Sequence, residues 1–89
     1  MKIKEGFVLR ELGDQFIVCP EGLDVLDSGR MFALNGPAAY LWQQVQGSDF
    51  TEETLLKLLV QEYDVQEQTA LRDVGSLVKA LKEFGVVEE

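Results

Sequence analysis

The side chains of this sequence that could do chemistry are few, and most of them are acids. Glu52 and Glu53 are neighbouring carboxylates, a residue type that can exchange protons in general acid–base catalysis. Cys19 is the single cysteine, and a nucleophilic thiolate needs a basic or imidazole neighbour. The sequence has no histidine, so a Cys–His pair and a Cys/His zinc cluster are both excluded. We therefore expect Cys19 to be a small buried apolar residue.

The remaining candidates for chemistry have structural explanations. Glu52 and Glu53 follow Thr51, a good helix N-cap, and the helix dipole favours negative charge in a first turn. Asp24 and Asp27 offer oxygen ligands, but their spacing does not match a calcium-binding EF-hand loop. No glycine-rich loop has the spacing that binds phosphate. The sequence therefore predicts a protein that is not an enzyme and that holds no metal or cofactor.

Charge and hydropathy narrow the class of protein further. The 89 residues include 16 acids and 8 bases, and this net charge of −8 opposes binding to the phosphates of nucleic acids. No apolar run approaches the roughly 20 residues that span a bilayer. The basic N-terminus lacks the apolar stretch of a signal peptide. The length and the 46% hydrophobic content predict one domain, residues 1–89, in the cytoplasm.

Strand-like segments fill the first third of the chain. The runs Gly6–Leu12 and Gln15–Cys19 are joined by Gly13-Asp14, which predicts a tight β-hairpin. This turn places Leu9 opposite Val18, Arg10 opposite Ile17 and Glu11 opposite Phe16. Pro20 should end the second strand, because it cannot donate a hydrogen bond. We expect a loop over 21–29 and a third strand over Arg30–Leu34.

Three helices should follow. Asn35 or Gly36 can cap the first helix, over 36–46, and Trp42 lies on its apolar stripe. The second helix begins after Thr51, with Phe50 and Leu55 spaced as a hydrophobic staple. Asp64 is the expected cap of the third helix, a long amphipathic segment that ends at Gly85. Val86-Val87 either adds a short strand or packs on the core. The predicted fold class is α+β, a small sheet packed on three helices.

The third strand is also a candidate binding surface. Its centre, Met31-Phe32-Ala33, has neither the proline nor the inward charge that blocks an exposed sheet edge. If Arg30–Leu34 is an edge strand, an extended peptide could add to it as a further strand. If the strand is internal or covered, this interpretation fails.

The following segments stand in this order along the chain: Phe7-Val8-Leu9-Arg10, Leu34-Asn35 with Ala38-Ala39 and Leu41-Trp42, Gly47 with Phe50-Thr51, Tyr63-Asp64, Asp73-Val74 and Gly85-Val86-Val87. Together they resemble the PqqD-like family. Each is weak alone, but their order and spacing are specific, and they cover the chain from about Phe7 to Val87. The segment 21–29 makes a longer connection before the third strand than we expect in the founding member of the family. The resemblance therefore favours the general family over pyrroloquinoline quinone biosynthesis itself.

This resemblance implies a winged-helix-like domain, the RiPP recognition element, which binds the leader segment of a ribosomally made precursor peptide. In the family the leader adds to the third strand beside the third helix, and the domain presents it to a modifying enzyme, often a radical SAM maturase. The implied peptide-binding residues here are Arg30, Met31, Phe32, Ala33, Leu34, Asp73, Leu77 and Lys79 or Ala80. Asp73 either contacts the peptide or stabilises the fold. The alternatives are a winged-helix nucleic-acid binder and a homodimerisation module.

Overall fold

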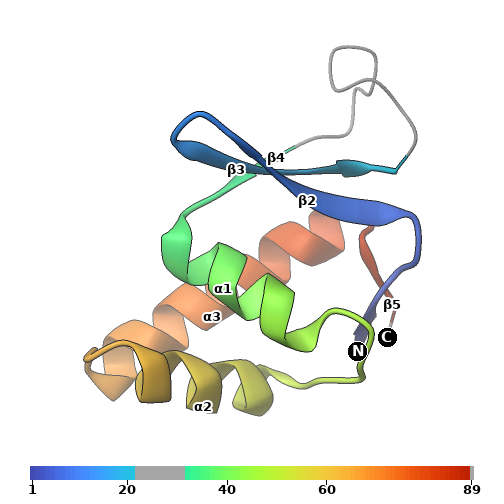
Figure 1. Ribbon diagram of the computed structural model, residues 1–89. Helices are drawn as coiled ribbons and strands as arrows, with labels where there is room; N and C mark the ends of the chain where they lie inside the picture. Colours follow the sequence, from blue (N-terminus) through green and yellow to red (C-terminus); the bar gives the residue numbers. More distant parts are fainter. Residues whose placement is uncertain (22–31, 89) are drawn as a thin grey trace.

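The computed structural model is an α+β domain in which a sheet covers three helices (Figure 1). It describes residues 1–21 and 32–88. The predicted fold class, a three-stranded antiparallel sheet packed on three helices, is confirmed. The elements are β1 (Lys2–Ile3), β2 (Phe7–Leu12), β3 (Gln15–Pro20), β4 (Phe32–Leu34), α1 (Gly36–Val45), α2 (Glu52–Glu62), α3 (Glu67–Glu83) and β5 (Val87–Glu88).

The main sheet has the strand order β2-β3-β4, and both pairs are antiparallel. The predicted hairpin is confirmed, with Leu9 opposite Val18 and Arg10 opposite Ile17. Gly13 adopts φ +61°, a left-handed conformation that glycine reaches without a steric penalty. Pro20 is the last residue of β3, as expected. The predicted strand residues Arg30 and Met31, and the predicted loop over 22–29 with its acids, lie outside the described residues.

A second, two-stranded sheet joins the two ends of the chain. β1 pairs antiparallel with β5, so that Ile3 lies opposite Val87. The Lys4 amide also donates to the Val86 carbonyl at 2.8 Å. Val86 and Val87 are buried, so this segment both adds a strand and packs on the core. The sequence analysis missed β1, because a strand of two residues is too short to show an alternating pattern.

The starts of the first two helices follow the sequence. The Asn35 side chain accepts a hydrogen bond from the Ala38 amide at 2.9 Å and caps α1. Helix α1 ends at Val45, one residue before the predicted end. Thr51 and Thr54 form a reciprocal capping box at the start of α2. The acids that follow Thr51 lie in the first turn, as their structural interpretation requires.

The predicted cap of α3 is wrong. The N-cap residue is Gln66, which makes no side-chain capping bond, and Asp64 lies two residues earlier on the surface. Between the helices the Val65 amide donates to the Tyr63 carbonyl at 2.9 Å, which closes a three-residue turn around Asp64. Val65 is partly buried and packs against the core. The turn and this packing hold Asp64 outside the helix, so that the helix starts later.

The core lies between the sheet and the helices. Trp42 is 2% exposed and lies in this core, and Cys19 is fully buried, as predicted for both residues. Val18, Leu55 and Val86 are also buried within it. The Trp42 indole Nε1 has no hydrogen-bond partner in the described part of the chain. The core therefore fixes β3 and α1 against α2 and the C-terminal segment.

None of the helices that the structure describes is long and apolar enough to cross a membrane.

Candidate functional site

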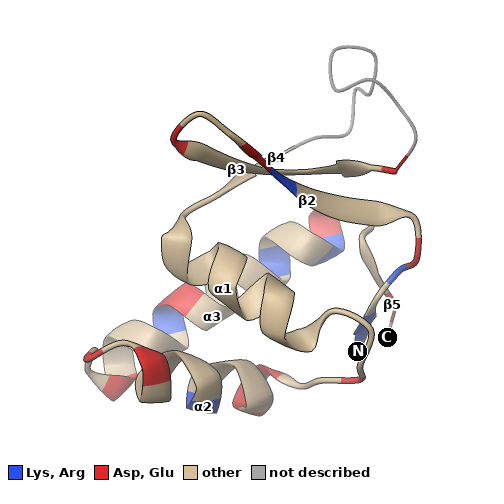
Figure 2. Cartoon of the chain, in the orientation of Figure 1, with Lys and Arg blue, Asp and Glu red and all other residues tan. Residues whose placement is uncertain are grey.

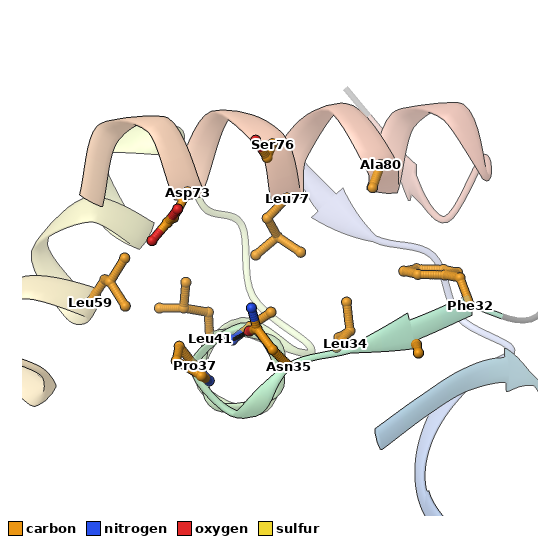
Figure 3. Close-up of a pocket in the computed structure, with 12 residues that line it drawn as sticks. Phe32, Leu34, Asn35, Pro37, Leu41, Leu59, Asp73, Ser76, Leu77 and Ala80 are labelled. Carbon is orange, nitrogen blue, oxygen red and sulfur yellow. Dashed lines mark hydrogen bonds between the residues drawn. The ribbon is translucent and has the colours of Figure 1, made fainter. Parts of the chain in front are cut away.

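A groove of about 260 Å³ lies between β4, the start of α1 and α3 (Figure 3). Helix α3 forms one wall, and β4 with the first turns of α1 forms the other. The α3 residues on this wall are spaced i, i+3, i+4 and i+7, which places them on one face of the helix. The lining residues are Phe32, Ala33, Leu34, Asn35, Pro37, Ala38, Leu41, Leu59, Asp73, Ser76, Leu77 and Ala80.

The two ends of the groove differ in chemistry. Figure 3 shows Ala80 near Phe32 at one end, and Asp73 near Leu59 at the other. Leu77 is buried at the centre. Asp73 is exposed, and it is the only charged residue among the described residues that line the groove. Figure 2 shows that α1 and β4 carry no charge. The groove is therefore an apolar channel with one carboxylate at one end.

An aromatic pair extends the wall at the Phe32 end. The rings of Phe32 and Phe84 stack, with their centroids 4.4 Å apart and an angle of 19° between their planes. Phe84 caps the C-terminus of α3 and remains 38% exposed. The sequence analysis did not assign Phe84 to this site. No local pattern could reveal the pair, because its two residues lie far apart in the sequence, one in β4 and the other at the end of α3.

The strand β4 is an edge of the main sheet: among the described strands, it pairs only with β3. Hydrogen bonding in an antiparallel pair alternates between successive residues. The Glu21 amide donates to the Gly6 carbonyl, so Glu21 bonds toward the β2 side. Counting back two residues at a time, Cys19 and Ile17 also direct their N–H and C=O groups toward β2.

The intervening residues of β3, Phe16 and Val18, therefore direct their amides and carbonyls toward β4. They lie opposite Leu34 and Phe32. It follows that the N–H and C=O groups of Ala33 point to the open side of the sheet. The Ala33 residue is also exposed. Within residues 1–21 and 32–88, the edge thus presents one donor and one acceptor without a backbone partner beside the groove.

The groove brings together six of the predicted site residues. They are Phe32, Ala33, Leu34, Asp73, Leu77 and Ala80. Arg30 and Met31 lie outside the described residues. Lys79, the alternative to Ala80, is exposed and does not line the groove. The sequence analysis assigned Asn35 to capping and made no site prediction for Pro37 or Leu41, and it therefore missed that these residues also line the groove.

Neither the groove nor the rest of the described chain offers a metal centre. No group of three or more Cys, Asp or Glu side chains is arranged to hold an ion in the described ranges 1–21 and 32–88. Cys19 is buried away from this surface. The chemistry that the site offers is therefore recognition by backbone hydrogen bonds, apolar contact and one negative charge.

Comparison with known proteins agrees with this description. The family model described as Coenzyme PQQ synthesis protein D (PqqD) matches residues 20–87, which is more than half of the chain. The chain belongs to the PqqD family. A search of curated proteins finds no match to this PqqD-family chain.

Two solved structures share the fold of this PqqD-family chain. One is TbiB1 in complex with the TbiA(beta) leader peptide, with a TM-score of 0.72 and 23% sequence identity. The match covers 99% of this chain and 95% of TbiB1. The other is a lasso peptide synthetase B1 complexed with the leader peptide, with a TM-score of 0.69 and 22% identity. That match covers 99% of this chain and 96% of the synthetase chain.

Proposed function

We propose that this protein is a non-catalytic recognition partner that binds the leader segment of a ribosomally made precursor peptide. The observation that carries this proposal is the open edge of β4 beside an apolar groove. Membership of the PqqD family supports it. Two structures of the same fold are complexes with leader peptides, which supports it further. In this proposal residues 1–89 act as one peptide-recognition domain in the cytoplasm.

The docked leader forms a further strand of the main sheet. Its backbone exchanges hydrogen bonds with Ala33, whose amide and carbonyl face the open side. Side chains alternate between the two faces of a strand and rise about 3.3 Å per residue. Leader residues two positions apart therefore point into the groove together, one toward Ala80 and the next toward Leu77. We include Arg30 and Met31 in the docking strand because they continue β4 in sequence.

The residues of the groove set which leader binds. Leu34 and Leu77 are already buried, so a leader gains most by covering the more exposed Phe32 and Phe84 rings. This geometry favours apolar anchor residues in the leader. Asp73 at the other end favours a lysine, an arginine or another hydrogen-bond donor. Among the described residues Asp73 forms no ion pair, so its carboxylate is available to such a group.

The partner of the complex is the enzyme that modifies the precursor, such as a radical SAM maturase. The protein contributes no chemistry in this proposal; it raises the local concentration of the precursor at the enzyme. One of the two structures with the same fold is a lasso peptide synthetase B1. A pathway other than pyrroloquinoline quinone synthesis is therefore an equally good candidate.

A titration tests the proposal directly. The ¹⁵N-labelled protein is titrated with the leader segment of the precursor peptide encoded beside its gene, and amide shifts are followed by NMR. We expect shifts at Phe32–Leu34 and over Asp73–Ala80, with few in the β2–β3 turn. A scrambled leader of the same composition is the control. Shifts that spare both β4 and α3 would contradict the proposed docking mode, and duplex DNA that binds at low salt would favour the nucleic-acid alternative.

A further inference from the structure

A second surface is formed by α2 and α3, away from the groove. Leu56 and Val60 lie one turn apart on α2, and Leu71 and Gly75 lie one turn apart on α3. These four residues, which we term the α2–α3 patch, line two hollows of about 400 and 230 Å³ that share Leu56. Val60 is 42% exposed and Leu71 is 53% exposed. The patch therefore leaves large apolar side chains in water.

The patch and the groove lie on different faces of α3. Each residue turns a helix by about 100°, so Leu71 and Asp73 point about 200° apart. The same relation separates Gly75 from Leu77. No residue that lines the groove also lines the two hollows. A molecule on the patch therefore does not compete with a peptide in the groove.

Gly75 has no role within the described part of the chain. It lies inside α3, where glycine destabilises a helix relative to alanine. Its φ is not positive, and a Cβ atom built there would meet nothing within 4 Å. Neither backbone conformation nor packing therefore explains the glycine. The missing side chain leaves room for a group from another molecule to approach the helix backbone.

Charge identifies the kind of molecule that fits. Glu52, Glu53 and Glu67 line the same hollows, with Lys57 as the single base. The Lys57 Nζ lies 3.5 Å from the Glu53 carboxylate, which leaves a net negative rim. Figure 2 shows acidic residues at both ends of α2. A second copy of this chain, with its net charge of −8, would bring like charges together. A partner with an apolar side chain ringed by Lys or Arg is complementary.

We propose that the α2–α3 patch docks the enzyme that modifies the bound precursor. An apolar side chain of the enzyme enters beside Gly75 and Leu71, and basic side chains around it face the three glutamates. This inference rests on the proposed function, because it assigns the partner from the peptide in the groove. The two faces of α3 then hold substrate and enzyme at the same time.

The test measures two affinities for each variant of the full chain. The probes are the leader peptide and the modifying enzyme encoded beside the precursor gene. In Leu71→Glu, we expect the enzyme affinity to fall about tenfold or more, as for a residue at the centre of an interface, with leader affinity unchanged. Leu12→Glu is the matched control, because Leu12 is 48% exposed at the end of β2 and should tolerate the same change. Gly75→Ala should raise the melting temperature and weaken enzyme binding.

The outcomes separate this inference from the proposed function. The inference is overturned if the wild type does not bind the enzyme. It is also overturned if folded Leu71→Glu and Gly75→Ala bind the enzyme as well as the wild type does. Sedimentation that shows a wild-type dimer and a monomeric Leu71→Glu variant also overturns it, because a second copy would then occupy the patch. Failure of the wild type to bind the leader refutes the proposed function instead, and it is read from the peptide measurement alone.

Discussion

Replacing Ala33 by proline should strongly weaken leader binding while the sheet stays folded. The Ala33 amide points away from β3, so the substitution removes no hydrogen bond from the β3–β4 pair. Proline is tolerated on an edge strand when its nitrogen faces solvent. The extended conformation of Phe32 is also the one that a following proline requires. The substitution should therefore remove the hydrogen bond from the Ala33 nitrogen to a leader without disturbing the fold of the sheet.

The size of the effect follows from the missing donor. A carbonyl of the leader that was paired with the Ala33 amide would be left unsatisfied at a cost of about 1–3 kcal/mol. This free energy corresponds to a fall in affinity of about 5- to 150-fold. The proline ring also occupies the space where the leader backbone would lie, so we expect a value near the upper end.

Isothermal titration with the leader peptide measures the affinity, and urea unfolding measures the free energy of unfolding. Ala33→Ser is the matched control, because it keeps the amide at an exposed position and should bind as the wild type does. An Ala33→Pro protein that is folded and binds within twofold of the wild type would refute docking at this edge. A variant that loses about 3 kcal/mol or more of stability, the cost of proline at a bonded position, would instead show that the Ala33 amide bonds to β3.

Three further substitutions test other parts of the argument. Asp73→Asn should lower the affinity for a leader with a basic residue about two- to fivefold, an effect that fades at high salt, without lowering the melting temperature; a large loss of stability would instead assign Asp73 to the fold. Trp42→Ala should reduce the free energy of unfolding by about 3–5 kcal/mol in urea titration, because the side chain is buried, and a loss below about 1 kcal/mol would contradict its place in the core. Thr51→Ala should remove about 1 kcal/mol by breaking the capping box, whereas Thr51→Ser should restore most of it, as thermal unfolding can show.

The features that could be predicted from sequence are those that a few neighbouring residues determine. Gly13-Asp14 fixes the hairpin and with it the register of Leu9 and Val18. Asn35 and Thr51 cap their helices by bonds to residues three positions later. The amphipathic pattern of the third helix was also clear from the sequence. The resemblance to a family then indicated which face to consider.

The features that escaped prediction depend on contacts between distant parts of the chain. The pairing of Ile3 with Val87 needs both ends of the folded chain to meet. The start of α3 was misplaced because the turn at Asp64 and the packing of Val65 on the core override the capping preference of Asp64. The stack of Phe32 on Phe84 has no local signal at all. Sequence patterns therefore located the strand of the site, and the resemblance pointed to the helix beside it. The contribution of α1 and Phe84 to the groove came only from the structure.

The Asn35 cap marks the point where β4 ends and α1 begins. Directly after Leu34, the Asn35 carbonyl accepts from the Ala39 amide and its side chain accepts from the Ala38 amide. Both acceptors are used by the first turn of α1, so the chain turns directly from strand to helix after Leu34. The described part of β4 therefore offers a short edge, with Ala33 as its outward-facing residue. In the proposed function, specificity for a leader then depends mainly on the side chains of the groove rather than on a long run of backbone pairing.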